Sequence, residues 1–460
     1  MPDWLVMRLP MLTTTLFVFA VGACVGSLIN VLVYRLPRGL DVVTPTSRCP
    51  SCGTKLTWRE NVPIIGWVLL RGRCRFCKTP ISAEYPLVET VVAVLFGGLF
   101  VLWYMVPPDT VVLGIELGAI APEWARNGPG LTWPAFTVLV LLVGSLVAMT
   151  IIDARTCTIP LELTWAPALA ALVLHTAHAA WFDHRYGPLQ PAIPGLWQTV
   201  APRRAWVSAP GEVWTLATGG FQGWGFFGRG LGGVVGVGVS CLLLAKGWIT
   251  RSFADYEAWE KDNAPALTER PDATTQSTAH PTDMWVQYPH ARREMIRELA
   301  FLAPPVVLGL AGGWLAQRLA GSPVMGDQGA LVQPDPAPLW LVVLGAVCMG
   351  YLIGGGVVWA VRIFGTLAFG KEAMGLGDVH LMAAVGACLG WIDAVIAFFG
   401  AAFVGLAWAV LAMVAGGRLK RAMPYGPFLA ISTLLVVLGK PLIETLLGRI
   451  FGMDAPLNLP

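Results

Sequence analysis

The sequence predicts an all-α polytopic membrane protein with about ten transmembrane helices. Hydrophobic residues make up 55% of its 460 positions and charged residues only 13%, whereas soluble domains are roughly a quarter charged. Apolar stretches of about 20 residues, the length that crosses a bilayer, recur along almost the whole chain. The net charge of +3 is too small to indicate a nucleic-acid partner.

The first apolar stretch, 11–36, is predicted to be a retained transmembrane helix. It is longer than the core of a secretory signal peptide, and no small-residue cleavage site leads into a soluble domain. Further spans are expected at 87–107, 134–152, 164–182, 227–248, 300–320, 339–365, 379–392, 394–416 and 426–447. Only Trp391-Ile392-Asp393 separates the short span 379–392 from the next.

Lysine and arginine gather on one side of the predicted membrane. The loop 37–86 carries eight such residues, whereas the next loop, 108–133, carries only Arg126. Alternate threading places the later basic loops on the side of 37–86, with 183–226 as the main exception. Because positively charged loops stay in the cytoplasm, we expect 37–86 to be cytoplasmic.

The predicted organisation has five regions, and two of its segments lie outside the membrane. The segment 183–226, rich in Pro, Trp and Gly, is expected to form an external loop. The segment 251–299 is expected to be polar and flexible, ending in an amphipathic helix around HARREMIRELAF. The regions are 1–36 (first span), 37–86 (cysteine loop), 87–182 (spans), 183–338 (two spans with both loops) and 339–460 (spans).

Four of the nine cysteines form two CxxC pairs in the loop 37–86: Cys49, Cys52, Cys74 and Cys77. Each pair makes a tight turn that directs two sulfurs to one point, and the four together match a four-thiolate zinc site. A redox CxxC is the alternative. Because four thiolates leave no open coordination position, we expect a structural Zn²⁺ that stabilises a small loop.

Two aspartates at helix ends are the candidate catalytic residues. Asp153 ends the apolar stretch LVAMTIID, and Asp378 follows Gly375 and Gly377 in MGLGDVHL. The predicted topology places both at the cytoplasmic face, where they could converge and share one proton. Each aspartate alone could instead be a helix cap or an interfacial charge, and the GxGD motif alone is weak in a glycine-rich chain.

Five stretches in a characteristic order resemble the type IV prepilin peptidases, a family of bacterial membrane aspartic peptidases with GxGD active sites. They are GSLINVLVYRLPRG (26–39), RCPSCGTKLTWRENVPIIGWVLLRGRCRFCKTPISAEYPLVE (48–89), IDARTCTIP (152–160), EAMGLGDVHLMAAVGACLGW (372–391) and PYGPFLA (424–430).

This resemblance implies an activity that spacing alone does not. Such enzymes cut the basic leader from prepilins or pseudopilins after a glycine, on the cytoplasmic face of the inner membrane. Many also methylate the new N-terminus with S-adenosylmethionine. The resemblance makes Asp153 and Asp378 the catalytic pair and the four cysteines the zinc ligands. Glu89 and Asn61 match polar positions of the family, with packing roles as an alternative.

The sequence departs from the family pattern at three places. His380 stands where lysine is usual, either as a packed group or as one that tunes the catalytic pair. Leu161 replaces an acidic or amide residue after Pro160. The region 183–338 would add two spans to the usual eight.

Two other classes of protein fit part of the pattern. A carboxylate-coupled transporter could use paired acids and broken glycine-rich helices, although no inverted repeat is evident. An inactive scaffold of a pilus or secretion machine would not need intact aspartates. Presenilin-like proteases share GxGD but not the cysteine loop.

Overall fold

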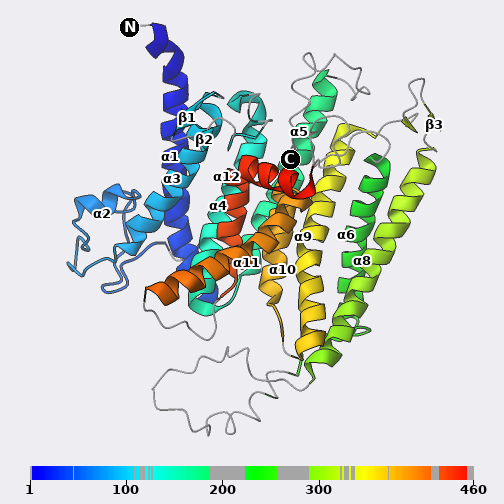
Figure 1. Cartoon of the computed structure of the whole chain (residues 1–460). Coiled ribbons are helices and arrows are strands. Elements are labelled where there is room, and N and C mark those ends of the chain that lie inside the picture. Colours follow the sequence, from blue (N-terminus) through cyan, green and yellow to red (C-terminus); the bar gives the residue numbers. More distant parts are fainter. Residues whose placement is uncertain are drawn as a thin grey trace.

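The computed structural model shows an almost entirely helical protein (Figure 1). The structure describes residues 3–44, 46–107, 109–112, 115–116, 120–122, 125, 128–186, 223–255, 259, 290–321, 324–325, 331–332, 337–370, 372–415 and 424–452. Most of the predicted loops 183–226 and 251–299 therefore lies outside the described residues.

The helices of the first half are α1 (Asp3–Arg35), α2 (Ile65–Leu69), α3 (Glu84–Tyr104), α4 (Pro129–Thr156) and α5 (Leu161–Tyr186). Those of the second half are α6 (Gly223–Ala245), α8 (Ala291–Leu319), α9 (Leu339–Phe369), α10 (Leu376–Leu389), α11 (Trp391–Val414) and α12 (Gly426–Phe451). A 3₁₀ turn, Leu36–Arg38, follows α1. Two antiparallel hairpins pair β1 (Val111–Val112) with β2 (Ile115–Glu116) and β3 (Val324–Met325) with β4 (Leu331–Val332).

The predicted membrane architecture is confirmed. Within the described part of the chain, nine helices are long and apolar enough to cross a membrane. The shorter α10 brings the apolar helices to the predicted ten. The expected amphipathic segment before span 300–320 is not a separate element, because α8 runs without a break from Ala291 to Leu319.

The short helix α10 is the centre of the bundle. It packs against α4, α5, α9, α11 and α12, and ten of its fourteen residues are buried. Gly386 of α10 lies directly against the backbone of Gly350 of α9, and a Cβ on either residue would collide with the carbonyl oxygen of the other. Close backbone approach through glycine thus holds α10 on α9.

The helices α6 and α8 form a pair that packs on the outer side of α9 (Figure 1). Two helices of membrane-spanning length, α6 and α8, thus lie within 183–338, where two spans are expected. Three α6 glycines, Gly228, Gly232 and Gly236, face the α8 backbone, where a Cβ would leave no room. The pair therefore joins the bundle through α9.

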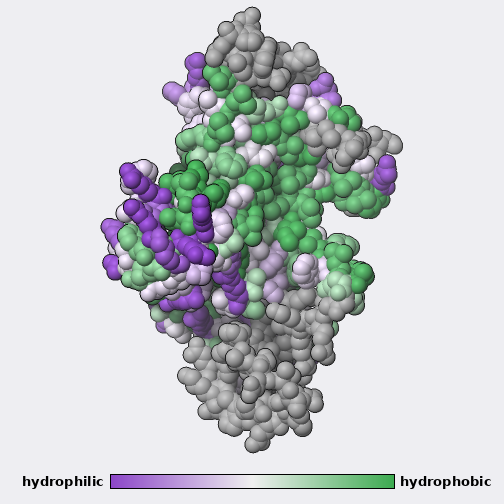
Figure 2. Space-filling view, turned by 90° about the vertical axis from the view of Figure 1, so that its left-hand side faces the viewer, coloured by the Kyte–Doolittle hydropathy of each residue, from purple (hydrophilic) through white to green (hydrophobic). Residues whose placement is uncertain are grey.

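The segment between α1 and α3 holds the four cysteines and projects sideways from the bundle (Figure 1). Figure 2 shows hydrophilic side chains gathered on this side of a largely hydrophobic surface. Exposed Lys55, Arg59, Arg71, Arg75 and Lys78 belong to this segment. We call residues 46–83 the cysteine module.

Candidate active site and metal centre

Asp153 lies in the last turn of α4 and is buried, with 5% of its surface exposed. The helix ends three residues later, where Cys157 adopts a left-handed conformation (φ 51°) and its N–H donates to the Asp153 carbonyl oxygen at 2.9 Å. The carboxylate thus sits at one end of an apolar span. Burial of a charged group at such a place is costly unless it is used or paired.

Asp378 lies in the first turn of α10 and is also buried, with 8% of its surface exposed. Gly375 precedes the helix in an extended conformation (φ −73°, ψ 149°). Gly377 packs against Ile159, in the α4–α5 connection, so closely that a Cβ at 377 would lie 2.9 Å from the Ile159 Cβ. Gly377 therefore allows the turn into α10 to approach the end of α4, whereas a Cβ on Gly375 would meet no atom closer than 3.7 Å.

The two aspartates converge through packing among α4, α10 and α12. Gly377, the neighbour of Asp378, packs against Ile159 just beyond the end of α4, although the two aspartates belong to distant parts of the chain. The N–H of Gly426, at the start of α12, donates to Oδ2 of Asp153 at 3.0 Å. The site is therefore a pair of buried carboxylates closed on one side by the start of α12.

The other predicted supporting residues lie on three different elements: His380 on α10, Glu89 on α3 and Asn61 in the cysteine module. His380 is half-buried on α10. Because residues two apart on a helix do not face each other, His380 and Asp378 lie on different faces of α10. Glu89 is buried in α3, where its Oε2 accepts from the Ile64 N–H at 2.6 Å. Asn61 is exposed in the cysteine module, and its N–H donates to the Trp58 carbonyl oxygen. Glu89 thus joins α3 to the cysteine module.

The two CxxC pairs of the cysteine module have the same local structure. The N–H of Cys49 donates to the Thr54 carbonyl oxygen at 3.0 Å, and that of Cys74 to the Thr79 carbonyl oxygen at 2.9 Å. The residues before these threonines, Gly53 and Lys78, are both left-handed, with φ 68° and 60°. Two equivalent knuckles therefore present their sulfurs in the same way.

The four thiols meet at one point, as predicted. All four Sγ atoms lie within 4.8 Å of one another, and Cys49 Sγ is 3.8 Å from Cys77 Sγ. A tetrahedron with Zn–S bonds of about 2.3 Å has sulfurs about 3.8 Å apart, so the cluster fits a zinc ion. A hydrogen bond with the Thr79 hydroxyl lowers the pKa of the Cys77 thiol to about 6, which favours the metal-binding thiolate.

Two further ion pairs lie in and beside the cysteine module. Glu60 forms an ion pair with Arg75 at 2.9 Å. Hydrogen bonds from Thr57, together with Arg75, lower the pKa of Glu60 to about 2. Glu84, at the start of α3, pairs with Arg155, two residues beyond Asp153. The cysteine cluster and the aspartate pair are therefore connected through α3 and the end of α4.

Sequence reasoning missed part of this site. The stretch PYGPFLA resembles a family motif, but the sequence alone indicates no role for Tyr425 or Gly426. Arg362, buried in α9, has no predicted role either, although it donates to the Met374 carbonyl oxygen just before the GxGD turn. A charged residue inside an apolar span was the available signal.

Comparisons with known proteins identify two domains. Residues 20–104 match the bacterial peptidase A24 N-terminal domain, and residues 313–410 match the type IV leader peptidase family. The four cysteines lie in the first match and Asp378 in the second, while Asp153 lies between the two.

Curated relatives carry the name prepilin leader peptidase/N-methyltransferase. One from Myxococcus xanthus is 51% identical over 80 residues, covering 17% of this chain and 24% of the relative. One from Klebsiella pneumoniae is 37% identical, covering 26% of this chain and 57% of the relative. One from Aeromonas hydrophila is 33% identical, covering 32% of this chain and 50% of the relative.

The chain thus spans from about a quarter to somewhat more than half of the length of these relatives. No solved structure matches it significantly. The matches lie in both halves of the chain and include the cysteine module and the GxGD turn. The chain is therefore similar to the type IV leader peptidases in these two regions.

Proposed function

We propose that this protein is a membrane aspartic peptidase that removes the leader of prepilins or pseudopilins, with Asp153 and Asp378 as the catalytic pair. One observation carries the proposal: two buried carboxylates from distant parts of the chain lie at the same end of the bundle, in the last turn of α4 and the first turn of α10, where Gly377 packs against Ile159. The names of the relatives support the substrate class. The site faces the cytoplasm of a bacterial inner membrane, as the basic residues of the cysteine module favour.

The geometry supports an acid–base mechanism. Two neighbouring carboxylates in a water-poor site hold one proton between them. The ionised member takes a proton from a water molecule, whose oxygen attacks the scissile carbonyl carbon while the protonated member gives its proton to the carbonyl oxygen. The tetrahedral intermediate then collapses: the carboxyl that took the proton from water gives it to the departing amide nitrogen, the C–N bond breaks, and a hydroxyl of the intermediate returns its proton to the other carboxylate. The Gly426 N–H orients Asp153 for these transfers.

The position of the pair favours a peptidase over a transporter. Asp153 lies in the last turn of its helix and Asp378 in the first turn of its own, whereas transporter sites lie near the middle of the membrane. A prepilin helix could lie along the bundle with its basic leader at this end.

Methylation of the new N-terminus is part of the proposal. It is supported by the printed names of the relatives, with S-adenosylmethionine as the methyl donor. Cys49, Cys52, Cys74 and Cys77 would hold one Zn²⁺. Since four thiolates saturate zinc, the ion would stabilise the cysteine module and take no part in hydrolysis.

Co-expression with a prepilin tests the peptidase. Asp153→Asn and Asp378→Asn keep the size of each side chain but remove the acid, so each is expected to abolish leader removal on an immunoblot. Glu162→Gln is the matched control, because Glu162 is an exposed acid near the end of α4. Processing by both aspartate variants at the wild-type rate would exclude an aspartic mechanism. Mass spectrometry of the mature N-terminus tests methylation.

A further inference from the structure

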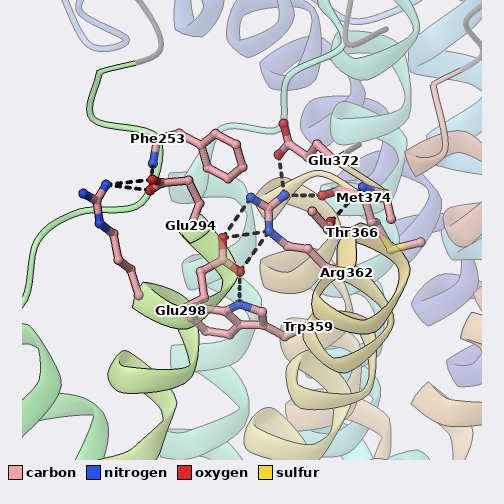
Figure 3. A network of polar contacts seen from close by, with 10 residues as sticks. Phe253, Glu294, Glu298, Trp359, Arg362, Thr366, Glu372 and Met374 are labelled. Carbon is pink, nitrogen blue, oxygen red and sulfur yellow. Dashed lines mark hydrogen bonds and ion pairs between the residues drawn. The ribbon is translucent and has the colours of Figure 1, made fainter. Parts of the chain in front are cut away.

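One arginine is completely buried inside the apolar helix α9. Arg362 has 0% of its surface exposed, and its guanidinium group joins three parts of the chain (Figure 3). Nε and Nη2 donate to the Glu298 carboxylate of α8 at 3.0–3.1 Å. Nη1 donates to the Glu372 carboxylate and to the Met374 carbonyl oxygen. Since Met374 directly precedes Gly375, this arginine binds the segment that leads into the GxGD turn.

The α8 partner is built into the same network. Glu298 is 3% exposed, and its Oε2 also accepts from the Trp359 indole N–H at 2.7 Å. The Phe253 ring lies 5.4 Å from the guanidinium carbon of Arg362. A buried carboxylate with several donors is held far more firmly than a surface ion pair. Glu298 therefore fixes the position of the guanidinium group from the side of the α6–α8 pair.

The segment before α10 is held by side chains of α9. The Ala373 N–H donates to the Thr366 hydroxyl at 3.1 Å, while the Met374 carbonyl oxygen accepts from Arg362. Side chains thus replace the regular hydrogen bonds that this irregular backbone lacks. The chain continues from Met374 through Gly375 into the first turn of α10, where Asp378 lies.

We propose that Arg362, held by Glu298, is a positioning residue that sets the GxGD turn, and that the α6–α8 pair thereby supports the active site. The inference rests on the proposed peptidase function. Arg362 acts through the backbone of Met374 and through its charge on Asp378. A small displacement of a catalytic group reduces turnover strongly even when the substrate still binds.

The test combines kinetics with hydrogen exchange on the purified full-length protein. Arg362→Met removes the donors, Glu298→Gln removes the α8 charge, and Arg362→Lys restores a cation without the planar fork. Lys440→Met is the matched control, because Lys440, which is partly buried, forms an ion pair at 3.1 Å with the buried Asp393 and so joins α12 to α11. Cleavage of a prepilin gives kcat and KM. Amide exchange is followed in the peptide containing Glu372 to Gly375.

The positioning role predicts a kcat loss of roughly 100-fold in Arg362→Met, a smaller loss in Glu298→Gln, and unchanged KM in both. Arg362→Lys should recover part of kcat. Exchange should rise in the peptide before α10 and stay unchanged elsewhere in α9 and α10, and Lys440→Met should show neither effect.

Wild-type kcat in Arg362→Met, or faster exchange throughout α9 and α10, would overturn the positioning role. In the second case the network would serve only folding. If the wild-type protein does not cut prepilin, the proposed function fails, while the exchange pattern still decides whether Arg362 and Glu298 hold the turn.

Discussion

The contact between Gly426 and Asp153 shows how a single backbone position can shape the candidate site. A Cβ built on Gly426 would lie 2.5 Å from Oδ2 of Asp153, the atom to which the Gly426 N–H donates at 3.0 Å. No side chain fits between them. Glycine at 426 therefore allows the first turn of α12 to place its N–H group against the carboxylate. Glycine is needed here because a Cβ has no room, not because the backbone must be flexible.

We expect Gly426→Ala to abolish leader removal, because the added methyl group must push Asp153 or α12 aside. Overpacking of this kind costs about 1–3 kcal/mol, so the protein should still accumulate in the membrane. Gly439→Ala, on the same helix with open space at its Cβ, is the control. Immunoblots of prepilin and of the enzyme measure both effects. Full processing by Gly426→Ala would show that the Asp153–Gly426 contact is dispensable.

At the scale of elements, nine of the described helices were predictable because each contains an apolar run of spanning length. Even the short α10 was visible, since Trp391-Ile392-Asp393 interrupts the apolar run after it. The cysteine module was predictable because each CxxC determines its own turn. These features depend on neighbouring residues, and pattern reasoning works well at that range.

The long-range contacts could not be predicted in the same way. Gly426 and Asp153 are 273 positions apart, and Arg362 and Glu298 are 64 apart on helices joined by a long connection. The sequence shows that Gly426 follows a tyrosine and that Arg362 lies in an apolar span. Neither pattern indicates which residue each one contacts. Only the packing of α12 on α4 and of α8 on α9 provides one.

The cysteine module is expected to bind one zinc ion per chain. Below about 40 residues a hydrophobic core rarely stabilises a fold alone, so Cys49→Ser should cause loss of zinc and increased proteolysis between α1 and α3. Cys241→Ser, an exposed cysteine of α6, should retain the metal. Elemental analysis of the purified proteins and limited proteolysis measure these effects. Purified wild-type protein without zinc, or Cys49→Ser with a full complement, would contradict this site.

For the whole molecule, the charge distribution and the fold agree on one orientation. The cysteine module, the end of α4 and the start of α10 belong to the same end of the bundle, as shown by the Glu84–Arg155 ion pair and the packing of Gly377 on Ile159. Basic residues concentrate in the cysteine module, whereas the connection from α3 to α4 carries only Arg126. Because positively charged segments resist translocation, this end should face the cytoplasm.

Reporter fusions test this orientation. Alkaline phosphatase, which is active only outside the cytoplasm, should be inactive when fused after Lys78 and active when fused after Asp109, beyond α3. A fluorescent protein that matures only in the cytoplasm should give the opposite pattern at the same two positions. If the basic residues determine the orientation, changing Arg71, Arg73 and Arg75 together to Gln should reduce the difference in reporter activity between the two positions. The control for loss of charge elsewhere is the same change at Arg292, Arg293 and Arg297 of α8. Phosphatase activity after Lys78 in the unaltered protein would place the aspartate pair on the outer face, where a leader that remains in the cytoplasm could not reach it.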